Sequence, residues 1–352
     1  MMGTLVVPFL AATGLVGAAT PVPPKVESAS AAALSQVVVV HDAQATDAFK
    51  PREDVVRQMV KTGITNLALT GSAKDAWKKW LATNDTVGIK VHSAPGANTG
   101  TRPAVVAAVV EQLLECGLPP SRIIIWDRQR ADLRQAGYFS LAEKYGVRVE
   151  GSVNAGFDPD SFYNPDRPVI GPLIWSDLEF GKKTPDAGRK SFLSKLVAKE
   201  ITKIVVITPV LNHNTAGVFG HLVSLAIGSV DNTLRFENDL LHLKSAVPEI
   251  YALPALSDRV VLCITDALVC QYEGEQRGLL HYSSAVNELR FSRDPVALDL
   301  LSLRELERQR VLSSQPVPHH NPFAAQMELL ENAALLELGA SDDSRIRIQH
   351  IP

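Results

Sequence analysis

Cysteine is scarce in this sequence, and no two cysteines have the spacing of a metal site. The three cysteines, Cys116, Cys263 and Cys270, lie far apart or inside apolar runs, and none forms a Cys-x-x-Cys pair. This excludes the ligand patterns of zinc ribbons and ferredoxin-type clusters. An iron–sulfur cluster is therefore not expected, and Cys116 and Cys263 are predicted to be thiols of the hydrophobic core.

The chain also lacks the short motifs of common catalytic and nucleotide-binding folds. It has no nucleophile elbow and no P-loop, and Gly96 and Gly100 lack both the third glycine of a dinucleotide fingerprint and the lysine of a P-loop. No repeat of fixed period occurs. The formal net charge is only -3, which argues against a nucleic-acid partner. The sequence identifies no protein partner.

The first 19 residues carry no charged side chain. Met1–Ala19 is mostly apolar and ends in small residues, as the apolar and cleavage regions of a secretory signal do, although the positive n-region is missing. We expect an exported or periplasmic protein with Pro21–Ala33 as a flexible leader; the alternative is a disordered Ala/Pro-rich tail. The apolar segment is short and interrupted by Pro and Gly, so no integral membrane span is expected in the mature chain.

Buried strands and amphipathic helices alternate along the rest of the chain. With 46% apolar residues, a sizeable core can form, and strands that are apolar on both faces require helices on both sides. The sequence predicts a three-layer α/β fold with a mainly parallel sheet. An open alternative divides it into α/β lobes at 34–150 and 189–352, joined by a linker or surface excursion at 151–188. The predicted strands are Gln36–His41, Thr86–Val91, Arg122–Trp126, Lys203–Thr208, Arg259–Thr265, Glu288–Phe291, a short one at Asn66–Thr70 and an edge strand at Arg345–Gln349.

A βαβ unit between Asp85 and Arg128 is the best-specified part of the sequence. A strand, a loop of small residues, a helix predicted over Thr101–Cys116 and a second strand follow one another. Thr101 can cap this helix, and Pro103 suits its first turn. Arg102 at the helix start could bind a phosphate or carboxylate. The alternative is an ordinary capped helix with a solvated arginine.

Polar residues follow five of the predicted strands. They are His41-Asp42, Lys90 with His92, Asp127-Arg128, Thr208 and Asp266. Ligands of parallel α/β sheets bind at the carboxyl ends of the strands. We therefore expect these residues to share one rim.

A second polar cluster lies between Val210 and His242. His213, His221 and Asp266 are candidate ligands of a divalent metal, although their spacing matches no zinc motif. The alternative for His221 is packing on a helix face. Asn232 and Arg235 could donate to an anion, or the asparagine could serve a turn. Helices are predicted at Lys190–Lys199 and Ala216–Gly228, on either side of the predicted strand Lys203–Thr208.

Two aspartates occupy the segment RDPVALDLL near the C-terminal end. Asp294 precedes Pro295 and is predicted to cap a helix. Asp299 lies inside that apolar helix, either on a solvated stripe or in a polar pocket. Burial without a partner would be costly, so the second case requires a neighbour such as Arg102 or Arg128.

These segments together resemble the domain-of-unknown-function family 362. The resemblance covers about Val37 to Arg308 and rests on GIKVHSAPG, TRPAVVAAVVEQLLECG, IIIWDR, DLRQAGY, ITPVLNHNTAGVFGHLVSLAIGSVDNTLRFEN, CITDAL and FSRDPVALDLL. Two features depart from the family. Leu211-Asn212 stand where members often carry a lysine before the histidine that matches His213, and the ferredoxin-type cysteines of some relatives are absent. The family implies no settled activity.

The sequence favours a small anionic ligand in a cleft at the strand ends. In the enzyme hypothesis, Lys90 and Arg102 hold the anion, His213 is the acid/base, and Asp127 or Asp266 orients it or holds a metal. Other candidate binding residues are His92, Thr101, Arg128, Asn232, Arg235 and Asp299. The alternatives are a non-catalytic metal-, nucleotide- or redox-partner-binding module of the cell envelope, and a structural protein.

Overall fold

A nine-stranded sheet organises the part of the chain that the computed structural model describes, which is residues 34–164, 188–313 and 322–352. The strand order is β13-β1-β12-β11-β9-β4-β5-β6, with β10 paired to β9. The bounds are β1 Ser35–His41, β4 Val87–Val91, β5 Ile123–Asp127, β6 Arg148–Gly151, β9 Lys203–His213, β10 Gly217–Val218, β11 Val260–Gln271, β12 Ser283–Ser292 and β13 Ile346–Ile351. Two small sheets pair β2 (Thr46–Asp47) with β3 (Lys50–Pro51), and β7 (Phe157–Tyr163) with β8 (Ser191–Ser194).

Most neighbouring strands of the large sheet run parallel. Strands β11, β9, β4, β5 and β6 are parallel to one another, whereas β12 runs antiparallel to its neighbours β11 and β1, and the short β10 runs antiparallel to β9. Strand β13 pairs in parallel with β1 at the edge. The mainly parallel sheet that the sequence predicts is therefore confirmed.

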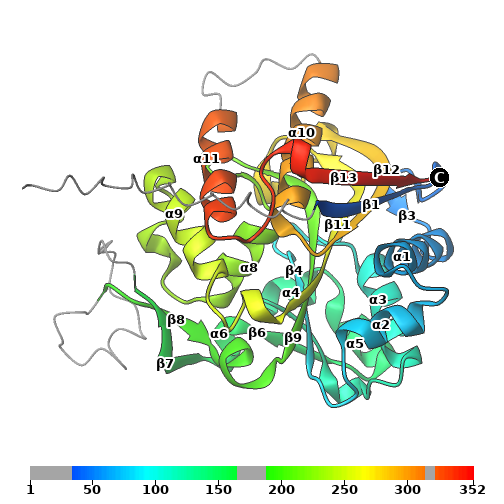
Figure 1. The fold of residues 1–352 in the computed structure, drawn as a ribbon, viewed down its shortest axis with the longest axis horizontal. Helices are drawn as coiled ribbons and strands as arrows, with labels where there is room; N and C mark the ends of the chain where they lie inside the picture. Colours follow the sequence, from blue (N-terminus) through cyan, green and yellow to red (C-terminus); the bar gives the residue numbers. More distant parts are fainter. Residues whose placement is uncertain (1–33, 165–187, 314–321) are drawn as a thin grey trace, which may run out of the picture. The chain divides into compact units, whose positions relative to one another are not determined.

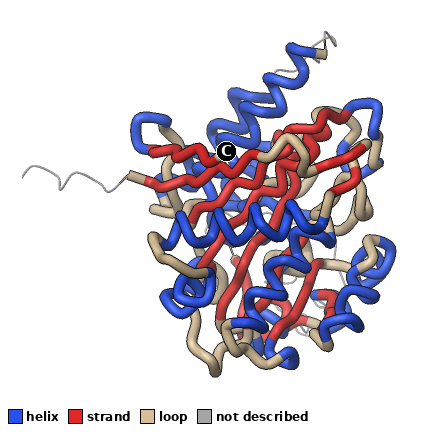
Figure 2. The backbone as a smooth tube through the Cα atoms, turned by 90° about the vertical axis from the view of Figure 1, so that its right-hand side faces the viewer, coloured by secondary structure: helices blue, strands red, loops and turns tan. Residues whose placement is uncertain are grey.

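Helices cover both faces of the sheet (Figures 1 and 2). One face packs against α1 Glu53–Ala68, α2 Ala73–Trp80, α3 Pro103–Glu115, α4 Arg130–Gln135 and α5 Tyr138–Tyr145. The other packs against α8 His221–Ser229, α9 Leu240–Tyr251, α10 Pro295–Leu312 and α11 Pro322–Leu335. The short helix α6 (Ser152–Ala155) follows β6. The result is a three-layer α/β fold.

The apolar runs in the sequence are explained by this layering. In β5, Ile123 and Ile125 pack into one core while Ile124 and Trp126 pack into the other, and all four side chains are fully buried. Successive side chains of a strand point to opposite faces. A strand between two helical layers must therefore be apolar throughout.

The direction in which the sheet grows reverses between β4 and β9. From β4 the chain adds β5 and then β6 on one side; it then returns to place β9 on the other side of β4 and adds β11 beyond it. The helices between strands accordingly lie on one face for β4 to β6 and on the opposite face for β9 to β11. Such a reversal leaves a crevice at the carboxyl ends of the two strands.

The open alternative of two lobes is wrong. Strands on both sides of the proposed division, β4 and β9, are hydrogen-bonded neighbours in one sheet, and residues 34–352 form one compact unit. The proposed linker begins at the last residue of β6 and contains α6 and β7 in its described part, and Tyr163 of β7 packs into the second core. Residues 165–187 and the signal-like segment 1–33 lie outside the described residues.

Three local predictions also need correction. Asn66–Thr70 mostly continues α1, because Ile64 and Ala68 still face the core. Lys190–Lys199 forms β8 and the start of a π-helical turn, since Ser191–Ser194 pairs with β7. The helix predicted from Ala216 begins only at His221, because Gly217 has a φ of +86° and pairs back to β9. Among the described residues, no helix has the length and apolarity needed to cross a membrane.

Candidate functional site

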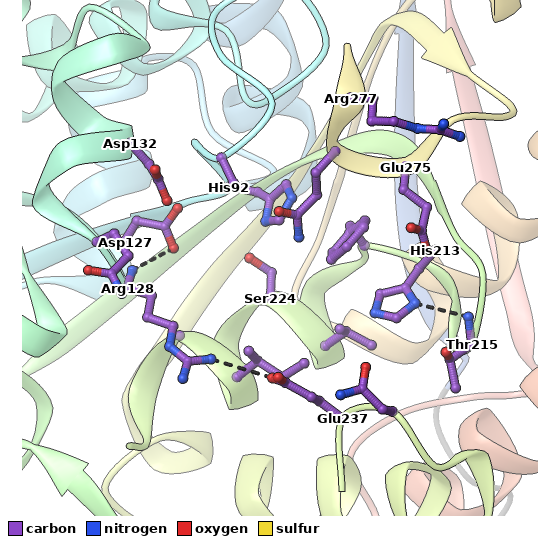
Figure 3. Close-up of a pocket in the computed structure, with 18 residues that line it drawn as sticks. His92, Asp127, Arg128, Asp132, His213, Thr215, Ser224, Glu237, Glu275 and Arg277 are labelled. Atoms are coloured by element: carbon purple, nitrogen blue, oxygen red, sulfur yellow. Dashed lines mark hydrogen bonds and ion pairs between the residues drawn. The ribbon is translucent and has the colours of Figure 1, made fainter. Parts of the chain in front are cut away.

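A pocket of about 600 Å³ lies at the point where the sheet reverses (Figure 3). Its walls include His92 after β4, Asp127 at the end of β5, and His213 at the end of β9. Ser224 of α8 and the 3₁₀ turn Glu275–Arg277, which follows β11, complete it. Three of the predicted strand-end residues, His92, Asp127 and Arg128, therefore line one hollow, and His213 of the second predicted cluster joins them.

A buried lysine lies behind one wall of the pocket. The side chain of Lys90 is fully buried, and its Nζ donates to Val91 O at 2.6 Å, to Asp127 Oδ1 at 2.8 Å and to Ser224 Oγ at 3.0 Å. Burial lowers the pKa of Lys90, and the charge of Asp127 opposes this effect. Three acceptors around Nζ match the three donors of an ammonium group, so Lys90 is committed to the protein and not to a ligand.

The carboxylate of Asp127 is fully used as well. Its Oδ2 accepts from the backbone N–H and the hydroxyl of Ser93, both at 2.7 Å, and its Oδ1 accepts from Lys90 and from the backbone N–H of Arg128. Burial alone would raise its pKa, but Lys90 and these donors lower the pKa below its usual value. Asp127 thus remains an ionised structural anchor of the pocket wall.

The hydrogen bonds of His213 fix its tautomer. Its Nδ1 accepts from the backbone N–H groups of Thr215 and Ala216, each at 3.1 Å. An Nδ1 that accepts two hydrogen bonds carries no proton, so the proton of the neutral ring is on Nε2. Burial lowers the pKa of His213 to about 4. In Figure 3 the ring turns from Thr215 toward the hollow, so His213 presents an N–H donor there.

This geometry changes the roles predicted for His213. A general base needs an unshared pair directed at the substrate, and a metal ligand needs the same on Nε2. Both would require the proton to move to Nδ1, which faces two N–H donors. The acid/base and metal-ligand predictions for His213 therefore disagree with its local hydrogen bonding.

His92 and His213 flank the same aromatic ring. The ring of Phe219 stacks on His92 with centroids 4.4 Å apart and contacts His213 at 4.3 Å. His92 is buried, and no described residue bonds its Nε2. Burial lowers the pKa of His92 to about 4; Asp127 opposes this, while Lys90 and His213 add to it. Both imidazoles are therefore neutral near pH 7.

Charged side chains line the pocket's remaining walls. Arg128 donates to Thr233 Oγ1 at 2.6 Å and lies 3.5 Å from Glu237. The guanidinium of Arg277 bonds the carbonyl of Gly274 and has no carboxylate partner among the residues that the structure describes. Glu275 has a φ of +50° and accepts from the N–H of Asn214 at 2.7 Å. An unfavourable backbone conformation held by such contacts often marks a functional loop.

The start of α3 is not a ligand site. Asp266 of β11 accepts the backbone N–H of Arg102 and, at 2.9 Å, its guanidinium, and both side chains are buried. Thr101 does not cap the helix; its hydroxyl accepts from His92 N and donates to Ile207 O. The chain's own carboxylate fills the anion site expected there. The predictions that Arg102 and Thr101 bind substrate are thus not supported by their contacts.

A second sealed group contains His221 and Asp299. Asp299 is buried and accepts from the backbone N–H groups of His221 and Leu222 and contacts His221 Nδ1 at 2.9 Å. The polar-pocket alternative for Asp299 is therefore confirmed, but its partner is His221 at the start of α8 and not Arg102 or Arg128. Asp294 caps α10 as predicted, accepting from Ala297 N at 2.8 Å.

The three metal candidates do not share a site. His213 lines the pocket, His221 contacts Asp299, and Asp266 pairs with Arg102. The described part of the chain contains no group of three or more His, Cys, Asp or Glu side chains that could hold a metal. Asn232 and Arg235 are buried beside Ser191 and do not line the pocket.

Sequence reasoning missed several residues of the pocket. Ser224, Asp132, Glu237, Glu275 and Arg277 line it but were not singled out. Strand β11 continues to Gln271, past the predicted end at Thr265. Glu275 and Arg277 follow its true end, so they were not recognised as strand-end residues. The run DLRQAGY, which contains Asp132, directly follows β5 and could have been read as a second strand-end signal.

Comparisons with known proteins identify no family. No family model matches the chain, and neither does any curated protein. A solved structure of a Thermotoga maritima protein from the Northeast Structural Genomics Consortium is similar, with 12% sequence identity and a TM-score of 0.40. The alignment covers 77% of this chain and 60% of that one, so this chain spans only three fifths of its length. The resemblance to family 362 stays a prediction.

Proposed function

We propose that the protein binds a small organic anion in the pocket between β4, β5 and β9. The observation that carries this proposal is the position of the pocket at the carboxyl ends of strands where the sheet order reverses. Crevices of this kind are the usual ligand sites of open α/β sheets. The volume of about 600 Å³ is within the range of small-molecule sites.

Two arginines of the pocket are the groups that would bind the anion. Arg277 has no carboxylate partner in the described chain. Arg128 lies near Glu237, which also accepts a hydrogen bond from the hydroxyl of Thr233. Guanidinium groups bind carboxylates and phosphates through paired N–H donors. In this proposal the two arginines bind the anion, which is the role that the sequence predicted for Lys90 and Arg102. The charges of Lys90 and Arg102 are neutralised by ion pairs inside the protein.

The pocket also carries carboxylates and neutral donors. Asp132, Glu237 and Glu275 can accept from hydroxyl or amino groups of a ligand, and the Nε2–H of His213 can donate to a carbonyl or carboxylate oxygen. This mixed lining favours a ligand with an anionic group at one end and polar groups along its length. A simple inorganic anion would leave most of these groups without partners.

Binding can be tested without knowing the natural ligand. Purified protein would be titrated by calorimetry with small 2-oxo and 2-hydroxy carboxylates and with sugar phosphates, at low and high ionic strength. We expect at least one class to bind and to weaken with salt, because exposed charge interactions are screened. Arg277→Gln should weaken this binding at least tenfold, whereas Arg347→Gln on the exposed edge strand β13 should not change it.

Two outcomes would refute the proposal. The first is the absence of binding by every compound in the panel at millimolar concentration, together with no small molecule released on denaturing the freshly purified protein. The second is equal loss of affinity in Arg277→Gln and Arg347→Gln, which would indicate a non-specific charge effect in place of a site.

A further inference from the structure

We propose that the pocket catalyses reversible proton removal from a carbon next to a carbonyl group, with Asp132 as the base and Ser224 and His213 as donors to the carbonyl oxygen. This inference rests on the proposed function, since it requires a bound organic anion. It assigns the ligand to one class, small anions that contain a ketone or aldehyde with an adjacent C–H bond.

Asp132 is distinguished from the other carboxylates of the pocket by its lack of donors. Asp127 accepts four hydrogen bonds, Glu237 accepts from Thr233 and faces Arg128, and Glu275 accepts from Asn214. Among the described residues, no group donates to the carboxylate of Asp132. An unengaged, partly buried carboxylate is the group best able to accept a proton from a ligand.

The surroundings of Asp132 support the same role. It lies in the first turn of α4, immediately after β5, and burial and the nearby charge of Asp127 raise its pKa. A carboxylate with a raised pKa is a stronger base when it is ionised. The neighbouring Asp127 is held ionised by Lys90, so the two adjacent carboxylates have distinct roles.

The hydrogen-bond inventory of Ser224 directs its proton into the pocket. All three N–H donors of Lys90 are used, and one of them goes to Ser224 Oγ. The hydroxyl cannot donate back to an ammonium group, and no described residue accepts its proton. Ser224 lines the pocket (Figure 3), so its O–H is available to a ligand while its oxygen accepts from Lys90.

His213 supplies a second neutral donor. Its Nδ1 is occupied by two backbone N–H groups, so its Nε2–H faces the pocket, and Figure 3 shows the ring and the Ser224 hydroxyl bordering the same hollow. Two fixed donors at one oxygen stabilise the negative charge that develops there. A neutral imidazole is suited to this role because its own acidity is matched to that of an enol.

The proposed step balances without another reactant. A carboxylate oxygen of Asp132 forms a bond to the proton of the C–H group, and the C–H electron pair becomes the C=C bond of an enolate. The carbonyl π pair moves to oxygen, where Ser224 and His213 donate to it. Return of a proton from Asp132 to carbon restores the carbonyl, and exchange of that proton with water leaves a label on the ligand.

Hydrogen–deuterium exchange tests the inference directly. The full chain would be incubated in deuterium oxide with 2-oxobutanoate, 2-oxoglutarate or dihydroxyacetone phosphate, and loss of the C–H signal would be followed by proton NMR. We expect exchange well above the buffer rate for at least one probe that binds. Asp132→Asn should slow it at least 100-fold, the scale of general base catalysis, with binding changed only a few-fold.

Matched variants separate a catalytic role from a structural one. Asp160→Asn, at an exposed position of β7, should exchange like the unmodified protein. Ser224→Ala and His213→Phe should each slow exchange about 100-fold, and the nitrogen NMR shifts of His213 should show the Nε2–H tautomer in the unmodified protein.

The outcomes distinguish the two proposals. A probe that binds but does not exchange faster than in buffer overturns the inference and leaves the proposed function in place. Exchange that survives Asp132→Asn also overturns it. Failure of all three probes to bind, by calorimetry, removes the oxo-anion class and the inference with it, and binding of a different anion from the wider panel would then preserve the proposed function alone.

Discussion

Two polar clusters lie at the carboxyl ends of strands in the same sheet. They differ in whether their polar groups bond to other groups of the protein or face the pocket. The pocket cluster, His92, Asp127, His213 and Ser224, borders the hollow and includes donors and a ring nitrogen that no described residue bonds. The sealed cluster, Arg102, His221, Asp266 and Asp299, is buried, and its carboxylates receive their donors from within the protein. Similar residue types thus border an open pocket in one place and are sealed in the protein interior in the other.

The difference follows from the sheet. Strands β9 and β11 are parallel neighbours that pair Pro209 with Asp266, and residues at the starts of α3 and α8 and within α10 make the polar contacts of the sealed cluster. Between β4 and β9 the chain reverses its direction of growth, and a pocket lies there, lined by His92, His213 and residues of α8. Whether a strand-end residue borders the pocket therefore depends on the neighbouring strand and not on its own sequence context.

The largest effect is expected from breaking the sealed ion pair. Asp266→Asn leaves the buried guanidinium of Arg102 without its counter-charge, and we expect a loss of about 3–5 kcal/mol in the free energy of unfolding. Urea denaturation would measure it. Asp127→Asn in the pocket cluster should cost clearly less, because Lys90, whose pKa is lowered by burial, can release its proton whereas a guanidinium cannot, and because Asp127 borders the pocket. Equal losses would contradict the distinction between the clusters.

Acid should weaken the pocket cluster. The pKa of His92 is lowered to about 4 by burial, so the unfolded chain, with a histidine pKa near 6.5, binds more protons between these values. Stability is therefore complete above about pH 6.5 and falls as the pH drops toward 4, by about 3 kcal/mol for His92. His92→Gln should flatten the pH dependence of urea midpoints, and an unchanged slope would contradict the prediction.

The third effect concerns Asp299, which the sequence linked to ligand binding. Asp299→Asn replaces a carboxylate that accepts from two backbone N–H groups with an amide, whose NH₂ would face one of them. The expected cost is about 1–3 kcal/mol of unfolding free energy, measured by urea denaturation. Because Asp299 is sealed from the pocket, affinity for any ligand of the pocket should not change. If Asp299→Asn selectively weakened ligand binding, Asp299 would be a residue of the functional site.

The fold was largely predictable from the sequence, whereas the membership of the site was not. Runs such as IIIW are buried on both faces of a sheet for a reason that is local to the strand, so layers and strands could be inferred. Lys90 and Asp127 were correctly expected at strand ends and Arg102 at a helix start, but their ion pairs depend on contacts between residues 37 and 164 positions apart. Such pairing is set by strand order, which a single sequence does not specify.

The smallest expected effect on stability comes from a hydroxyl that the pocket needs. Ser224→Ala removes one of three acceptors of Lys90, and because Val91 O and Asp127 remain, the free energy of unfolding should fall by only about 1 kcal/mol. Ser229→Ala in the same helix removes a hydroxyl that only bonds Leu225 O, and its cost should be similar. The two variants should differ in exchange of a bound oxo-anion, which Ser224→Ala slows and Ser229→Ala does not, because only the first hydroxyl faces the pocket. If both variants lose stability equally and neither affects exchange, Ser224 is a structural residue like those of the sealed cluster. Its only role would then be to accept the hydrogen bond of Lys90.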